Sequence, residues 1–394
     1  MNAEFSGVQI LSNSEFRIHN SEFHHVKYYL IAGERSGDFH AARLMGALKQ
    51  HDARAEFRCW GGDMMEEAGG TMVHHYQEMA IMGFLEAATA VFKFRRFLKE
   101  CEQDLLAHKP DVLILVDYAG FNLRVAKFAK AHGIKVFYYI SPKIWAWNQG
   151  RVHKIKALVD KMFVILPFER EFYQRFGYDV DYIGNPTADA VHEHPVTDDF
   201  HQRNGFDPQR PIIAVLPGSR KQEIEEMLFE MLRILPPFLD YQFVVAGVSN
   251  LDPGYYRHFE RINVRIVTDQ TYDLLRHAKA AVVTSGTATL ETALFDVPQV
   301  VCYRTSAVSY QLAKSFIKVK YISLVNLIAG REVVKELIQG DFTARNLVTE
   351  LHRVLDDEKY IAEVKAGYAE IREKLGRTNA ADKAAELMVG YLNN

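Results

Sequence analysis

Cysteine is scarce in this chain of 394 residues, and proline is not abundant either: there are 3 cysteines and 12 prolines. The cysteines, Cys59, Cys101 and Cys302, lie far apart and have neither zinc-ligand spacing nor the pattern of a disulfide framework. With 24 glycines and 48% hydrophobic residues, the composition excludes a collagen-like or largely disordered chain. We expect a globular protein of two or three domains in a reducing compartment, the cytoplasm.

An excess of positive charge is also missing. The 47 Lys and Arg residues face 50 Asp and Glu residues, which gives a formal net charge of −3. Non-specific nucleic-acid binding needs a basic surface that displaces counterions, so nucleic acid is not an expected partner. No apolar run approaches the ~20 residues of a spanning helix, and the first residues lack the features of a secretory signal. The sequence therefore predicts a protein that neither spans a membrane nor is exported by that route.

Residues 1–26 lack the apolar periodicity of a helix or a strand. They are polar and contain Asn-Ser-Glu-Phe twice, at residues 13–16 and 20–23. We expect a disordered N-terminal extension, of the kind that a start codon chosen too far upstream produces. A regulatory tail is the alternative.

From residue 27 onward, short apolar strands alternate with helices. The expected strands lie at residues 28–32, 111–117, 136–140, 212–216, 242–246, 264–267, 280–284 and 300–303. Such alternation predicts parallel sheets covered by helices on both faces. The fold class we predict is α/β, with two Rossmann-like, doubly wound domains. They are expected at residues 27–188 and 211–345, with a polar connector at 189–210 and C-terminal helices at 346–394 that could pack on either domain.

Ligands bind beyond the carboxyl ends of the strands in such sheets, so polar loops after strands are the candidate sites. In the second domain, residues 216–220 read Leu-Pro-Gly-Ser-Arg, where a glycine permits close backbone approach and Arg220 offers a two-pronged donor to phosphate. Residues 285–291 offer hydroxyls and then Glu291, which can bind a ribose diol. Helix capping alone explains either loop. Two amide-rich loops in one domain are what a nucleotide diphosphate requires.

In the first domain, Asp117 ends an apolar strand and is either a helix-capping group or a base. Glu34 and Asp38 lie in a neighbouring loop after a strand. Three carboxylates at one edge could bind a metal. We expect none, because no histidine or further acidic cluster has ligand spacing.

Two of the three tryptophans, Trp145 and Trp147, follow another strand, and the cations Arg151 and Lys154 come shortly after them. Aromatic rings stack on sugars, and the cations suit a phosphate. Core packing at a domain hinge is the alternative for the tryptophans.

Residues 84–100 predict a helix that could lie on a lipid surface. One face, with Val91 and Phe94, is explained as core. Phe92 and Phe97 lie away from that face among basic residues, a composition typical of an anionic membrane interface. A helix buried on two sides, with its charges at the rim, is the alternative.

Together these motifs make the chain from residue 27 onward similar to the lipid-A-disaccharide synthases, inverting glycosyltransferases of the GT-B type. The resemblance rests on residues 32–38, 82–86, 117 with 121–123, 141–147, 166–169, 216–220, 285–291 and 323–330. It implies transfer of 2,3-diacylglucosamine from UDP to 2,3-diacylglucosamine 1-phosphate, giving a β-1′,6 disaccharide and UDP, with no cofactor or metal. It also implies a cytoplasmic enzyme held peripherally at the inner membrane, and an oligomer is compatible with it. Residues beside the matched positions depart from the family pattern, among them Arg35, Lys143 and Val325.

The resemblance assigns roles to individual residues. Asp117 would be the catalytic base, Arg220 would stabilise the charge on the leaving UDP, and Glu34 would lie in the cleft as a further catalytic residue without an assigned role. The residues expected to bind UDP are Gly218, Ser219, Arg220, Ser285, Gly286, Thr287, Glu291 and Asn326. Those expected around the acceptor and sugar are Ser36, Asp38, Asn122, Trp145 and Trp147.

Two alternatives stay open at this point. One is another nucleotide-sugar enzyme of the same architecture, such as a UDP-GlcNAc 2-epimerase or a peptidoglycan glycosyltransferase. The other is a non-catalytic sugar-nucleotide sensor, which would need no base at position 117.

Overall fold

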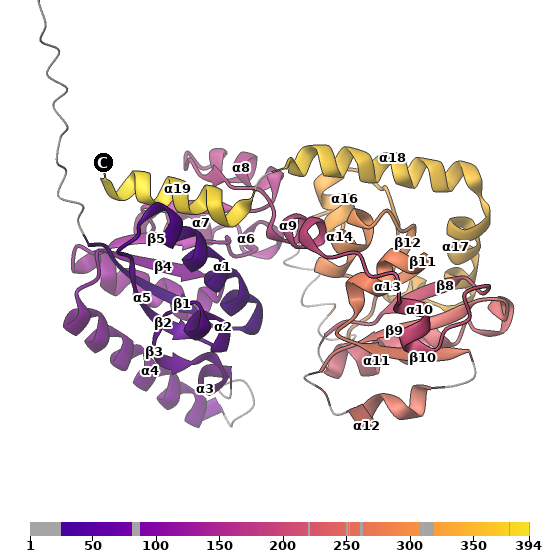
Figure 1. The fold of residues 1–394 in the computed structure, drawn as a ribbon. Helices are drawn as coiled ribbons and strands as arrows, with labels where there is room; N and C mark the ends of the chain where they lie inside the picture. The colour runs from indigo at the N-terminus through magenta and orange to yellow at the C-terminus, as the bar shows by residue number, and fades with distance from the viewer. Residues whose placement is uncertain are drawn as a thin grey trace, which may run out of the picture.

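The structure is a computed structural model that describes residues 25–80, 87–219, 221–249, 251, 253–260, 263–306, 310, 319–377 and 379–393. It forms two α/β units side by side (Figure 1). The described chain begins two residues before the expected edge of the first domain. His25 hydrogen-bonds Glu56 at 2.9 Å, and Val26 packs against the core. Most of the expected N-terminal extension, residues 1–24, lies outside the described residues.

The first unit is built on a seven-stranded parallel sheet, ordered β3-β2-β1-β4-β5-β6-β7. Its strands are β1 (Lys27–Ala32), β2 (Glu56–Gly61), β3 (Thr71–His75), β4 (Val112–Val116), β5 (Lys135–Tyr139), β6 (Lys161–Val164) and β7 (Asp181–Tyr182). The order reverses between β1 and β4, which pair in register from Tyr28 with Val112 to Ala32 with Val116. The loops after β1 and β4 therefore lie side by side at the switch point, where open α/β sheets bind ligands.

Helices cover both faces of this sheet, because alternate side chains of its buried strands enter two different cores. Tyr29 and Ile31 face one core, and Tyr28 and Leu30 face the other. The helices of the unit are α1 (Arg35–His51), α2 (Asp63–Glu67), α3 (Tyr76–Ala80), α4 (Ala87–His108), α5 (Ala119–Ala131), α6 (Ile144–Trp147), α7 (Arg151–Leu158) and α8 (Pro167–Gln174). Helices α4, α5 and α7 contribute to the first core, and α1 to the second.

The second unit has a six-stranded parallel sheet, ordered β10-β9-β8-β11-β12-β13. Its strands are β8 (Ile212–Leu216), β9 (Gln242–Gly247), β10 (Val264–Thr268), β11 (Ala278–Thr284), β12 (Gln299–Tyr303) and β13 (Lys335–Ile338). The helices along this part are α9 (Pro186–Glu193), α10 (Phe200–Asn204), α11 (Lys221–Leu232), α12 (Pro253–Tyr256), α13 (Thr271–His277), α14 (Thr287–Leu294), α16 (Leu324–Ala329) and α17 (Ala344–Asp356). Two parallel, helix-covered sheets confirm the predicted fold class.

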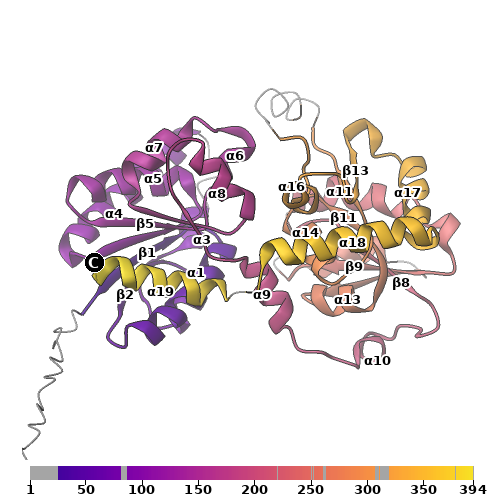
Figure 2. The ribbon, with the colours of Figure 1, turned by 90° about the horizontal axis from the view of Figure 1, so that it is seen from above.

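The last two helices connect both units. Helix α18 (Glu358–Leu375) packs on α14, α16 and α17, whereas α19 (Ala380–Asn393) returns to the first unit and packs along α1 (Figure 2). The contact with α1 is close because α19 buries small residues there, including Ala384 and Ala385. The C-terminal helices thus pack on both units, an arrangement that the sequence left open.

Candidate active site

Asp117 stands immediately after β4 in a backbone conformation that is rare for a residue with a side chain. Its φ is 44°, and that of Tyr118 is 39°, both in the left-handed region. The backbone carbonyl of Asp117 accepts hydrogen bonds from Asn122 Nδ2, at 2.9 Å, and from the Tyr138 hydroxyl. Two buried side chains therefore hold the strained turn that carries the carboxylate.

The loop after β1 lies against this turn. A Cβ on Gly33 would come within 2.3 Å of the Tyr118 ring, so only glycine lets the two loops approach this closely. Glu34 follows at the exposed start of α1, with no hydrogen bond to that helix from its own side chain. The close approach places the charge of Glu34 within electrostatic reach of Asp117.

The surroundings of Asp117 strengthen it as a base. Burial raises the pKa of its carboxyl above the ordinary value, and the negative charge of Glu34 raises it further. Lys143 and the backbone N–H of Tyr118 act in the opposite direction without cancelling the rise. A carboxylate with a raised pKa holds a proton more strongly, which suits a general base.

Two residues expected around the acceptor have structural roles instead. The Asp38 carboxylate is buried and accepts hydrogen bonds from the backbone N–H groups of Gly62, Met64 and Met65 at 2.8–3.2 Å. It therefore caps α2, because its place in the first turn of α1 directs it toward the end of β2. Asn122 is fully buried and positions the Asp117 backbone, so it is not a surface for the acceptor. Ser36, by contrast, is exposed.

The two tryptophans after β5 differ. Trp145 is 5% exposed and donates its indole N–H to Glu169 Oε1 at 3.1 Å, so the core interpretation holds for it and its expected sugar contact is corrected. Trp147 is 48% exposed, and the Arg151 guanidinium lies 5.1 Å from its ring centre. The pKa of Glu169 is raised to about 7, chiefly by burial. Trp147 remains available to a ligand.

In the second unit, both expected phosphate loops follow strands and precede helices. Gly218 has φ 113°, which favours glycine, and Ser219 is exposed. Arg220 lies outside the described residues. After β11, Ser285 Oγ donates to the carbonyl of Ile322 at 2.9 Å, and Thr287 is exposed at the start of α14, with Gly286 as its N-cap. Among the described residues, the hydroxyls of Ser219 and Thr287 have no hydrogen-bond partner, whereas that of Ser285 is used within the fold.

Glu291 has a partner that the sequence pattern did not reveal. Tyr272, in the first turn of α13, donates its hydroxyl to Glu291 Oε1 at 2.9 Å. Burial raises the pKa of Glu291, and this hydrogen bond partly opposes the rise. No spacing rule links the two residues, because the contact depends on how α13 and α14 cross.

Asn326, expected among the UDP ligands, is a buried structural residue. Its amide donates to the carbonyl of Val334 and to Glu336 Oε1, and its oxygen accepts from the backbone N–H groups of Val333 and Val334. These bonds, of 2.7–3.0 Å, use both donors and the acceptor oxygen. Because Asn326 is fully buried on a short helix, the assignment is corrected: it fixes the segment before β13.

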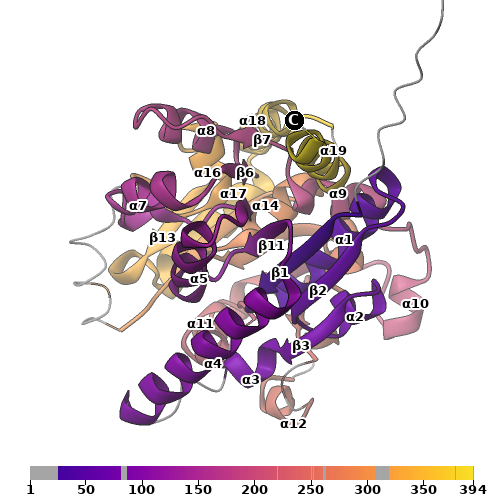
Figure 3. The same cartoon turned by 90° about the vertical axis from the view of Figure 1, so that its left-hand side faces the viewer.

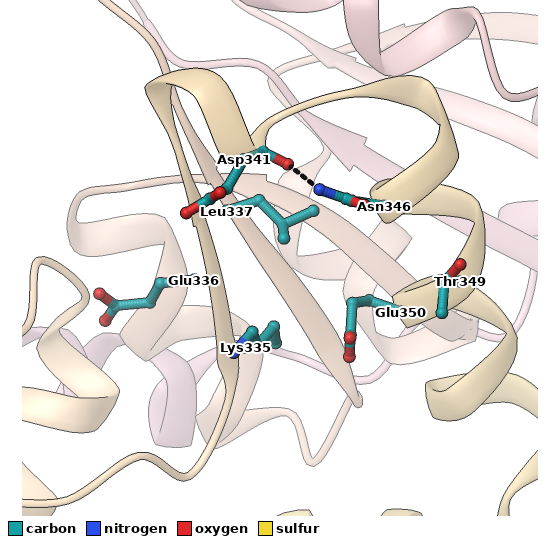
Figure 4. Close-up of a pocket in the computed structure, with 7 residues that line it drawn as sticks. All are labelled: Lys335, Glu336, Leu337, Asp341, Asn346, Thr349 and Glu350. Atoms are coloured by element: carbon teal, nitrogen blue, oxygen red, sulfur yellow. Dashed lines mark hydrogen bonds between the residues drawn. The ribbon is translucent and has the colours of Figure 1, made fainter.

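A small pocket near β13 does not fit a diphosphate. It has a volume of about 290 Å³ and lies between β13 and α17 (Figure 4). Glu336, Asp341 and Glu350 line it, against the single cation Lys335. A larger groove of about 1350 Å³ lies at the amino ends of β1, β4 and β5, lined by residues such as Asp111. Neither hollow is at the loops that carry Asp117 or Ser219.

The described part of the chain contains no group of three or more His, Cys, Asp or Glu side chains arranged to hold a metal ion. None of the described helices is both long and apolar enough to cross a bilayer.

Comparison with known proteins identifies the family. The lipid-A-disaccharide synthetase family model matches residues 28–388. The chain belongs to this family. The lipid-A-disaccharide synthase of Geobacter sulfurreducens is 37% identical over 92% of this chain and 96% of its own length. That of Myxococcus xanthus is 39% identical over 92% and 97%.

The family settles the class of reaction predicted from the motifs. Members are glycosyltransferases that form the lipid A disaccharide, so the chain is an enzyme that uses a nucleotide sugar and a lipid acceptor. The alternatives are not favoured, although the fold is shared. A UDP-GlcNAc 2-epimerase from Neisseria meningitidis, bound to UDP-GlcNAc, superposes with a TM-score of 0.64 at 13% identity over 93% of this chain and all of the epimerase. The calicheamicin glycosyltransferase CalG4 gives 0.58 at 16% identity over 93% and 98%.

Proposed function

We propose that this enzyme moves 2,3-diacylglucosamine from UDP to the 6-hydroxyl of 2,3-diacylglucosamine 1-phosphate, with Asp117 as the base. The observation that carries the proposal is the Asp117 turn: a carboxylate at the switch point, held in a strained backbone by Asn122 and Tyr138. Such strain recurs at functional sites. Family membership supplies the reaction class.

In this mechanism the acceptor oxygen attacks the anomeric carbon of the donor from the side opposite UDP. The bond between that carbon and the UDP oxygen breaks, and the hydroxyl proton passes to Asp117. One displacement inverts the configuration, and a single base suffices. Glu34 strengthens Asp117 by raising its pKa.

The donor is proposed to bind at the carboxyl edge of the second sheet. Gly218, Ser219 and Arg220 would hold the pyrophosphate, with Thr287 at the start of α14, and Glu291 would hold the ribose. The part-buried Tyr272–Glu291 hydrogen bond supports the last assignment, because it orients the carboxylate. Residues 27–188 would form the acceptor domain and residues 211–345 the donor domain, with closure of the two excluding water.

We further propose that α4 holds the enzyme at the cytoplasmic face of the inner membrane, on an anionic surface. Val91 and Phe92 are 50% and 70% exposed, and Arg95 and Arg96 beside them are exposed cations. Phe97 does not belong to this surface: it is 3% exposed and packs against Trp60. Drawing ten methylenes of an acyl chain from a bilayer into water costs ~8 kcal/mol. An enzyme that binds its substrates at the membrane surface avoids this cost.

The test is to incubate the purified enzyme with UDP-2,3-diacylglucosamine and the acceptor phospholipid, and to identify the products by mass spectrometry. We expect UDP and the disaccharide in equal amounts. Free sugar and UDP without disaccharide would contradict the transfer. A product with UDP still attached but epimerised at C2 would favour the epimerase, and UDP-sugar binding without turnover would favour the sensor.

A further inference from the structure

Four cations lie on α5 and α7, two helices that cover the same face of the first sheet. Arg124 and Lys127 lie one turn apart on α5, and Arg151 and Lys154 lie one turn apart on α7. The two helices pack against each other (Figure 3). Burial and the charges of Arg124, Arg151 and Lys127, in that order, lower the pKa of Lys154, so its ammonium group lies within reach of all three.

Within the described residues, no carboxylate pairs with any of these four cations, whereas Lys130 on the same α5 pairs with Asp160. Arg124 instead bonds the carbonyl of Gly120, and its guanidinium lies 4.9 Å from the centre of the Phe94 ring. Cations crowded in this way repel one another, and a bound anion relieves the repulsion.

The cluster reaches the reaction centre through Arg151. Its guanidinium lies over the exposed Trp147, on the loop that follows β5. The charge of Arg151 also acts on the hydroxyl of Tyr138, which bonds the Asp117 carbonyl. An anion held by Arg151 and Lys154 would thus lie on the side of the Asp117 turn where Tyr138 and Trp147 stand, near the edge of the sheet where the acceptor is expected.

We propose that Arg151 and Lys154, with Arg124 and Lys127 behind them, bind the phosphate monoester of the acceptor and select phosphorylated acceptors. This rests on the proposed function. A phosphate monoester carries a charge of about −1.5 to −2 and three acceptor oxygens. Arginine can form a bidentate pair of hydrogen bonds with the phosphate, and lysine supplies a point charge. In a hexose 1-phosphate the 6-hydroxyl lies at the other end of the sugar, free to point toward Asp117.

The same chemistry could serve a phospholipid headgroup, so the experiment uses a short-chain acceptor below its aggregation concentration, without vesicles. Initial rates are measured for the parent and for Lys154→Met, Arg151→Met and Arg151→Lys. We expect the KM for the acceptor to rise about tenfold or more in the Met variants, the size of a charged hydrogen bond. The KM for the UDP donor should change less than about twofold, and Arg151→Lys should recover part of the loss. Lys156→Met is the control, because Lys156 lies on the same helix but bonds the carbonyls of Phe176 and Gly177.

A second substrate sharpens the test. An acceptor analogue without the phosphate should be a poor substrate for the parent, and the Met variants should use it as well as the parent does. Calorimetry of acceptor binding to the parent and to Lys154→Met gives the same comparison without turnover. A parent that binds the acceptor but forms no disaccharide would contradict the proposed function and leave the phosphate site to be judged by calorimetry alone.

Three results would overturn the phosphate site. An unchanged acceptor KM in both Met variants would show that the cluster does not contact the phosphate. Weaker binding to anionic vesicles with an unchanged acceptor KM would assign the cluster to lipid headgroups. If the Met variants lose the same activity with the phosphorylated and the unphosphorylated acceptor, the cations have a structural role.

Discussion

At the scale of single residues, the polar side chains that follow strands divide into those that bond the fold itself and those that can meet a ligand. Polar side chains after strands were the signal for the site, and this signal singled out Asp117, whose backbone carbonyl is held by Asn122 and Tyr138. The same signal included Asp38, and the family resemblance added Asn326, but both side chains bond backbone groups inside the fold. A sequence shows that a residue can accept hydrogen bonds. It does not show which donors the folded chain brings to it.

We predict that Asp117→Asn lowers kcat by ~100-fold or more while UDP affinity stays nearly unchanged. The amide has the same shape but cannot take the proton. Asparagine tolerates a positive φ, so the turn should survive the change. Steady-state rates and UDP calorimetry on the same preparation check both parts. Turnover within a few-fold of the parent would remove Asp117 from the role of base.

The pH profile should respond to the neighbours of Asp117. The base works only when deprotonated, so kcat/KM falls as the pH drops through its raised pKa. Removing the like charge in Glu34→Gln lowers that pKa and should move the acid limb to lower pH. Removing the opposite charge in Lys143→Met should move it to higher pH. Shifts in the same direction for both variants would contradict an electrostatic origin.

At the scale of elements, the pattern of strands and helices was readable wherever burial was continuous. The strand expected at residues 212–216 and the apolar run at 112–116 match β8 and β4, because both are buried along their whole length. The buried face of helix α4 was harder to predict from the sequence. Its period predicted a core face with Val91, yet Val91 is exposed and Phe97 is buried. The helix continues to His108, and α5 and β2 determine which of its faces is covered. The spacing of apolar residues within the helix does not show where these neighbours lie.

The lipid contact of α4 can be tested with this corrected face. We predict that Val91→Ser, Phe92→Ser and Arg96→Glu together weaken co-sedimentation with anionic vesicles and leave the melting temperature within a few degrees of the parent's. The parent's binding should also weaken with added salt, because its electrostatic part is screened. Leu106→Ser is the matched control, since Leu106 is 46% exposed on the same helix. Equal sedimentation of the triple variant and the parent would show that the acyl chains are met elsewhere.

At the scale of the whole molecule, the two parallel sheets followed from the sequence because strand–helix alternation leaves few topologies. The packing position of the last helix, α19, did not follow from the sequence. An alanine-rich amphipathic segment fits any apolar surface, and its choice of α1 depends on complementary spacing and on a few polar contacts. Asp189 Oδ2 accepts the N–H of Ala380 at 2.7 Å, and Asp382 pairs with His51 at 2.8 Å. These contacts join segments that are far apart in the sequence.

The return of α19 to the first unit should contribute measurably to stability. Ala384 is fully buried against the core that also contains residues of β1 and α1. We predict that Ala384→Glu lowers the melting temperature by about 5 °C or more, because it forces a larger, charged group into a close-packed contact at ~2–4 kcal/mol. Glu386→Ala, on the exposed side of the same helix, should change it by less than about 2 °C. The rate at 20 °C should stay near the parent's in both variants, since α19 lies on the face of the sheet opposite to α5 and α7. Calorimetric scans with initial-rate assays check this, and an unchanged melting temperature for Ala384→Glu would show that α19 is held only loosely on the first unit.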